Sequence, residues 1–147
     1  MTDAHSPILF LSGAGLPTWI WDEVSERLST VSAVAPRPAR HSDAPLSAYV
    51  EAAVDAAPPG RFAIVAHSSG GVVGAELARI LEDRVSSFLA ISAVIPTGTD
   101  SFVSAMPVPN RWILPPVMRL AGTRPPDKAI RRGLCGGLND DDVERIV

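Results

Sequence analysis

The sequence has 147 residues, of which 46% are hydrophobic and 20% are charged, and its formal net charge at pH 7 is −3. These values are typical of a single globular domain and exclude a wholly disordered chain. Because the basic residues form no cluster, we expect no binding to nucleic acid or to an anionic membrane surface.

The amino-terminal segment contains Asp3 and no basic residue before its first apolar run, which is not the pattern of a secretory signal. No apolar stretch reaches the roughly 20 residues that a membrane span needs. The single cysteine, Cys135, excludes a disulfide within the chain, and we interpret it as a small buried side chain. We therefore expect a soluble cytoplasmic protein, without a metal site or a cofactor.

Four apolar runs that end near glycine or proline predict strands at residues 7–13, 30–36, 62–67 and 87–96. Between them, apolar residues at helical spacing predict helices over 18–29, where Thr18 is placed to cap the first turn, and over 45–57 and 70–84. This alternation predicts a parallel sheet with helices on both faces, a three-layer α/β sandwich. The strands are continuous apolar runs, as expected where both faces are covered.

The composition changes after residue 96. Residues 97–147 are rich in proline and predict short helices in an irregular layer, so we divide the chain into a core, 1–96, and a second segment, 97–147. Asn139 is placed to cap a last helix whose apolar stripe is Val143, Ile146 and Val147. A helix this short is marginal alone, and we expect the sequence to stop within an element.

One turn carries the main functional signal. In IVAHSSGGVVG, residues 64–74, Ser68 stands between a predicted strand and a predicted helix, and the positions two before and two after it are the small residues Ala66 and Gly70. A side chain presented there requires a sharp, strained turn, and strand and helix nearly touch. The segment resembles the nucleophile elbow G-x-S-x-G of the α/β-hydrolase fold, with Ala66 in place of the first glycine.

A second segment carries the same resemblance. LSGAGLPTWIW, residues 11–21, is similar to the HGAGxxxWxW segment of small esterases in the α/β-hydrolase superfamily, with Ser12 in place of the histidine. The resemblance implies that Ser68 is the catalytic nucleophile and that the backbone N–H groups of Ala14 and Ser69 form the oxyanion hole. It also implies that residues 97–147 are a helical cap over the pocket, in a partial α/β-hydrolase fold.

The base that would activate Ser68 is not evident. In α/β-hydrolases the nucleophile is followed along the chain by an acid and then by a histidine, but no histidine follows Ser68 here. His5 precedes the first strand, and strand alternation predicts that His67 points away from Ser68. His41 follows the second strand, at the edge where ligands bind, and is either a helper or, as we prefer, a loop residue.

Carboxylates that could orient a histidine are present after the elbow. Without that histidine we interpret them as solvated charges or helix-start residues; they are Asp100, Asp127 and the run Asp140–Asp142. We therefore expect the chain to be the amino-terminal part of a serine hydrolase that ends within its cap, with acid and histidine encoded beyond Val147.

The same motifs allow other interpretations. Instead of presenting a nucleophile, the serine turn could simply cap the amino-terminus of the helix, or it could hold a phosphate there. Gly13–Thr18 partly matches the dinucleotide fingerprint G-x-G-x-x-G, with Arg37 available for a 2′-phosphate, but the acidic residue is missing.

We expect a serine esterase acting on a small carboxylic ester or a related acyl compound. Serine at the elbow leaves esterase, thioesterase, lactonase and lyase-like chemistry open. The alternative is a catalytically incomplete module that binds a small apolar ligand or a partner chain. Four strands leave an exposed sheet edge, through which copies of the chain could form a homo-oligomer.

Overall fold

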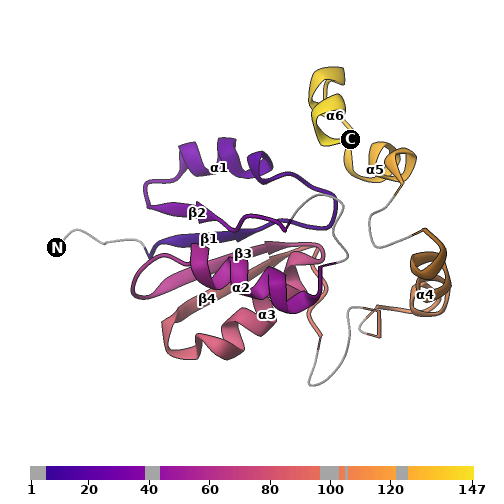
Figure 1. Cartoon of the computed structure of the whole chain (residues 1–147). Coiled ribbons are helices and arrows are strands. Elements are labelled where there is room, and N and C mark those ends of the chain that lie inside the picture. The colour runs from indigo at the N-terminus through magenta and orange to yellow at the C-terminus, as the bar shows by residue number, and fades with distance from the viewer. Residues whose placement is uncertain (1–5, 39–43, 97–102, 105, 122–125) are drawn as a thin grey trace.

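The structure, a computed structural model, describes residues 6–38, 44–96, 103–104, 106–121 and 126–147. Its centre is a parallel sheet of β1 (Ile8–Leu11), β2 (Ser32–Val34), β3 (Phe62–His67) and β4 (Val85–Ile91), in the order β2-β1-β3-β4 (Figure 1). All four predicted strands are present. β4 ends before the predicted residue 96 because Ser92 adopts a left-handed φ of 44° and turns the chain.

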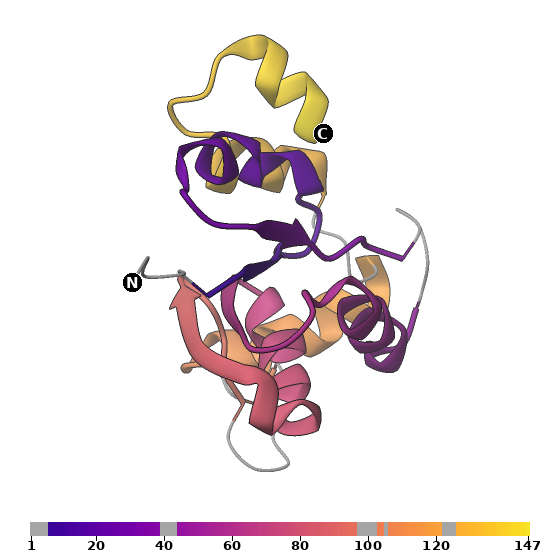
Figure 2. The ribbon, with the colours of Figure 1, turned by 90° about the vertical axis from the view of Figure 1, so that its left-hand side faces the viewer.

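Helices connect the strands on both sides of the sheet. The 3₁₀ turn η1 (Thr18–Trp21) and α1 (Asp22–Arg27) join β1 to β2, α2 (Leu46–Ala56) joins β2 to β3, and α3 (Gly70–Ile80) with η2 (Glu82–Arg84) joins β3 to β4. In the sheet, the step from β1 to β2 runs toward one edge, whereas the steps from β2 to β3 and from β3 to β4 run toward the opposite edge. Right-handed crossovers therefore place α1 on one face and α2 and α3 on the other (Figures 1 and 2). The predicted three-layer α/β architecture is confirmed.

The first connection differs from the prediction. A 3₁₀ turn precedes α1, and the position before it is Pro17, so Thr18 lies inside the turn and caps nothing. Because a 3₁₀ turn holds three residues rather than 3.6, it shifts the helical register. The apolar residues at helical spacing in the helix predicted over 18–29 are Trp21, Val24 and Leu28. Only Trp21 is buried, while Val24 and Leu28 are exposed.

The main core lies between the sheet and the α2–α3 layer. Its fully buried side chains come from β1, β3, α2 and α3, and include Leu9, Ala53, Ile64 and Leu77. β4 is different, because Leu89 and Ile91 are 57% and 43% exposed. The prediction that both faces of every strand are covered is therefore wrong for β4, which lies at the edge of the sheet.

Three helices follow β4: α4 (Asn110–Ala121), α5 (Asp127–Leu134) and α6 (Asp140–Ile146). α4 stands apart from the sheet, with Trp112 70% exposed (Figure 1). Asn139 caps α6 as predicted, because its side chain accepts a hydrogen bond of 2.9 Å from the Asp142 N–H. None of the helices in the described ranges is long and apolar enough to cross a membrane.

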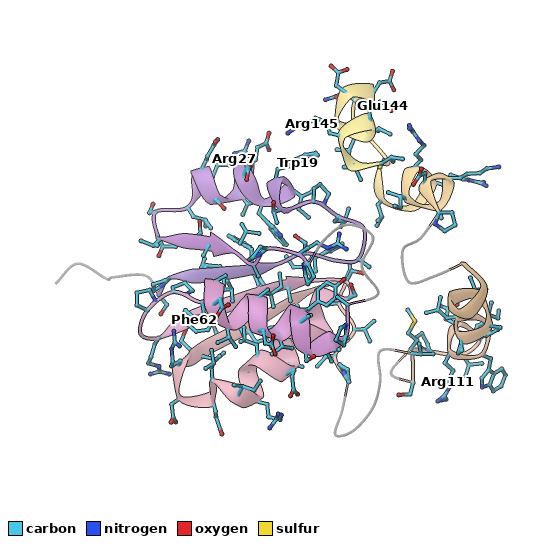
Figure 3. All side chains as sticks on the ribbon, in the orientation of Figure 1. Trp19, Arg27, Phe62, Arg111, Glu144 and Arg145 are labelled. Atoms are coloured by element: carbon cyan, nitrogen blue, oxygen red, sulfur yellow. The ribbon has the colours of Figure 1, made fainter. Side chains whose placement is uncertain are left out.

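α5 and α6 pack on the segment that follows β1. Ile130, Cys135 and Ile146 are buried against Leu16 in a second apolar cluster, to which Trp19 also contributes. The burial of Cys135 agrees with its interpretation as a core residue. The Arg145 guanidinium lies 4.1 Å from the centre of the Trp19 ring, where the two side chains approach each other in Figure 3. The cluster fixes the carboxy-terminal helices over the β1–α1 loop.

Candidate active site

Ser68 occupies a strained turn between β3 and α3. Its φ is 53°, one of two left-handed conformations at non-glycine residues in the described part of the chain, and such a conformation costs about 1–3 kcal/mol. Neighbouring backbone holds it there: the Ser68 N–H donates to the Ile91 carbonyl, and the Ser68 carbonyl accepts from the N–H groups of Gly71 and Val94. The Ser68 hydroxyl makes no hydrogen bond to any other described residue.

Small residues let the strand and helix meet at this turn. Ala66 is fully buried, and a Cβ added to Gly70 would lie 2.6 Å from the Leu11 carbonyl oxygen. A Cβ added to Gly71 would lie 2.5 Å from the Val94 carbonyl oxygen. Since these neighbours are backbone atoms of the sheet and its edge, a side chain at either glycine would separate α3 from the sheet. The close approach predicted for the elbow is therefore present.

The loop after β1 lies directly against the turn. A Cβ on Gly13 would be 2.8 Å from Ser68 Cβ and 3.3 Å from Ser68 Oγ. The Ala14 N–H donates a hydrogen bond of 2.7 Å to Ser69 Oγ. The structure thus brings together Ser68, Ala14 and Ser69, the three residues that the sequence singled out. In this state the Ala14 N–H is occupied by the hydroxyl of Ser69.

Side chains around the loop fix its orientation. Ser12 Oγ accepts a hydrogen bond of 2.9 Å from Trp21 Nε1, and the Trp21 indole stacks on Phe10 with ring centres 4.6 Å apart. Arg37 donates to the Leu16 carbonyl at 3.0 Å. Ser12 therefore ties the loop to the 3₁₀ turn η1. Arg37 is used in the same way, which weakens its interpretation as a ligand for a 2′-phosphate.

His67 does not point away from Ser68, contrary to the prediction. A Cβ added to Gly13 would lie 3.3 Å from Ser68 Oγ and 3.1 Å from His67 Nδ1. Both side chains therefore converge on Gly13. Side chains alternate only along extended backbone, and the left-handed Ser68 breaks the alternation. His67 Nδ1 is buried without a hydrogen-bond partner among the described residues, and burial lowers the pKa of His67 from its ordinary value. Burial therefore favours the neutral form of the imidazole.

The structure describes only some of the other candidate base and acid residues. His5, His41 and Asp100 lie outside the described residues. Asp127 opens α5, and the run Asp140–Asp142 forms the first turn of α6, which agrees with their interpretation as helix-start residues. No group of three or more potential metal ligands occurs among the described residues.

A cleft of about 790 Å³ lies between the core and the carboxy-terminal helices. Its wall on the core side includes His67 and Ser92, which neighbour the turn, whereas Ser68 itself is not part of the lining. The apolar part of the lining comes from both sides: Leu16, Trp19, Ile20, Leu134, Leu138 and Ile146. Sequence reasoning missed Ser92, because the prediction placed it inside the strand at 87–96; its position after an apolar run is a weak signal.

A comparison with known protein families identifies the family of this chain. The chain matches the Alpha/beta hydrolase family over residues 8–145, and it belongs to that family. No curated protein matches the sequence at a significant level.

Solved structures show the same fold at low sequence identity. An extracellular alpha/beta-hydrolase from a Paenibacillus species, described as sharing structural and functional homology with tobacco salicylic acid binding protein 2, has a TM-score of 0.74 and 16% identity. The match covers 95% of this chain and 63% of that protein. A histidine-to-alanine variant of tomato methylketone synthase I, complexed with beta-ketoheptanoate, has a TM-score of 0.70, 12% identity and coverages of 97% and 65%.

A histidine-to-alanine variant of polyneuridine aldehyde esterase has a TM-score of 0.68, 14% identity and coverages of 97% and 66%. The chain thus spans slightly less than two thirds of the length of these three structures.

Proposed function

We propose that Ser68 is the nucleophile of a serine hydrolase that acts on a carboxylic ester or a related small acyl compound. The observation that carries the proposal is the left-handed turn at Ser68, held by backbone hydrogen bonds although serine disfavours it. Such strain persists only where the surrounding structure enforces it, and it gathers at functional sites. Membership of the family and the adjoining Ala14 loop support the same assignment.

The chemistry follows from the position of these groups. Ser68 Oγ attacks the carbonyl carbon of the ester, its proton passes to a base, and the carbonyl oxygen becomes an oxyanion. The N–H groups of Ala14 and Ser69 stabilise that charge, and one such donor typically contributes a factor of about 10²–10³ in rate. Collapse of the intermediate releases the alcohol, and water then releases the acid from Ser68.

We assign the base and its orienting carboxylate to polypeptide beyond Val147. None of the described residues donates to or accepts from Ser68 Oγ, and the similar structures are longer than this chain. In this proposal α4, α5 and α6 belong to a cap, and the apolar wall of the cleft receives the acyl group. The exposed edge at β4 pairs with the further strands, or with β4 of a second copy.

Covalent labelling with a fluorophosphonate tests the assignment. In a form of the protein that continues beyond Val147, we expect rapid labelling that maps to Ser68, is abolished by Ser68→Ala and is unchanged in the control Ser47→Ala, whose residue is exposed on α2. The 147-residue chain should label far more slowly. Labelling at another residue would refute the nucleophile, and rapid labelling of the short chain would refute the external base and direct attention to His41.

The non-catalytic alternative is favoured by one observation, the occupation of the Ala14 N–H by Ser69 Oγ. In that case the cleft would bind a small apolar ligand without turnover. The same experiment separates the two functions, because a binding module would leave Ser68 unlabelled in both forms.

A further inference from the structure

Ser92 is one of two non-glycine residues in the described part of the chain that adopt a left-handed conformation. Its φ is 44°, compared with 53° at Ser68. Glycine adopts such a φ without steric cost and would suit the turn that ends β4. The Ser92 side chain does not stabilise that turn, because its hydroxyl forms no hydrogen bond with another described residue. Neither the backbone conformation nor local bonding therefore accounts for a serine at position 92.

Ser92 lies beside the candidate nucleophile at the carboxyl end of the sheet. β3 and β4 are parallel neighbours with His67 opposite Ile91, so Ser68 and Ser92 are the residues that follow on the two strands. The Ser68 N–H donates to the Ile91 carbonyl at 3.3 Å, and the Val94 N–H donates to the Ser68 carbonyl at 3.2 Å. Backbone bonds on both sides of Ser92 thus fix it against the turn. Since adjacent strands are about 4.8 Å apart, Ser92 can reach a ligand atom a few bonds from the attacked carbonyl carbon.

The cleft of about 790 Å³ gives Ser92 access to a ligand, because Ser92 is part of its lining. His67 lines the same wall, and burial lowers the pKa of His67 and so favours its neutral form. The basic residue of the described lining, Arg145, lies 3.3 Å from Asp142 and packs on the Trp19 ring. This cation is therefore already engaged, which favours a neutral polar group on the ligand over an anion.

We infer that the Ser92 hydroxyl binds a neutral oxygen substituent of the substrate, close to the ester group that Ser68 attacks. A serine hydroxyl donates one hydrogen bond and accepts two, so it suits a hydroxyl substituent, which also does both. The apolar wall, which includes Leu16 and Ile146, receives the rest of the acyl chain. The inference rests on the proposed function and narrows its substrate class to acyl compounds with a hydroxyl near the ester, such as 3-hydroxyacyl esters. Ser92 then determines specificity and takes no part in bond breaking.

Binding of matched esters tests the inference without turnover. Methyl butyrate and each enantiomer of methyl 3-hydroxybutyrate are titrated into the 147-residue chain, and the amide signals of Ser92 and Val94 are followed by NMR. We expect wild type to bind one hydroxy ester about three- to tenfold more tightly than methyl butyrate, the net effect of one hydrogen bond. Ser92→Ala should bind the esters equally. The matched control Ser87→Ala, at an exposed position earlier in β4 and outside the cleft lining, should keep the preference.

Ser92→Gly separates ligand binding from structure. It removes the same hydroxyl but suits the left-handed backbone, so it should lose the preference while its urea midpoint rises above that of Ser92→Ala. Equal binding of the esters by wild type, absence of binding by wild type, or a preference that persists in Ser92→Ala would each overturn the inference. Failure of the proposed function is recognised separately, by the absence of fluorophosphonate on Ser68 in the longer form.

Discussion

Replacing Gly70 by alanine tests the close approach of α3 to the sheet. The new Cβ would lie 2.6 Å from the Leu11 carbonyl oxygen and 3.0 Å from both the Leu11 carbonyl carbon and the Ser12 carbonyl oxygen. Ordinary contacts begin at about 3.5 Å, so all three are too short. Because Leu11 ends β1, which is paired on both sides, its backbone cannot move away freely. We expect a loss of about 1–3 kcal/mol in the free energy of unfolding, typical of overpacking.

Urea denaturation measures this loss, and the chain offers a matched control. Gly133 lies within α5 and has no atom within 4 Å of an added Cβ. Gly133→Ala should therefore stabilise the protein by about 0.5–1 kcal/mol, the ordinary gain in a helix. The two alanine substitutions should thus have opposite signs. If Gly70→Ala proved as stable as wild type, α3 would not approach β1 as described, and the geometry of the turn at Ser68 would be wrong.

Three further variants probe the turn and the packing around it. Ser68→Gly removes a side chain from a left-handed backbone, so urea denaturation should show a gain of about 1 kcal/mol, while labelling is lost; a loss of stability would contradict the strain. Burial lowers the pKa of His67, so as the pH falls the unfolded chain takes up a proton at a higher pH than the folded chain does. The stability that is present above pH 6.5 is therefore lost as the pH falls from the unfolded pKa toward the folded pKa. His67→Asn should lose less stability than wild type between pH 7.5 and 5.5, and an identical loss would refute this. Ile130→Ala empties a fully buried position, at a cost of about 2–5 kcal/mol, and should expose residues 126–147 to limited proteolysis while the sheet stays protected; unchanged cleavage would show that the second cluster does not hold α5 and α6.

The order of strands and helices could be predicted because the signals are local. Apolar runs closed by glycine or proline mark each strand, and the right-handed crossover rule then fixes the layers. Element ends were less predictable. Thr18 looked like an N-cap, but the register depends on the 3₁₀ turn after Pro17. The exposure of Leu89 and Ile91 depends on what lies beside β4, which a run of apolar residues does not reveal.

The site was predictable in part for the same reason. The small residues around Ser68 and the glycines of the β1 loop are visible in the sequence, and the structure places the two segments together. Two features depend on three-dimensional packing instead. His67 turns toward Gly13 because the left-handed turn breaks strand alternation. The Ser69 hydroxyl accepts a hydrogen bond from the Ala14 N–H and does not cap its own helix. Neither follows from residue spacing.

The central claim is that the turn at Ser68 presents a nucleophile to an oxyanion hole formed by the N–H groups of Ala14 and Ser69. A crystal structure of the protein after prolonged treatment with excess fluorophosphonate tests it most directly. The account predicts phosphorus bonded to Ser68 Oγ, with the phosphoryl oxygen about 2.7–3.1 Å from the backbone nitrogens of Ala14 and Ser69. Phosphorus on another side chain, or a phosphoryl oxygen directed away from Ser69, would contradict it.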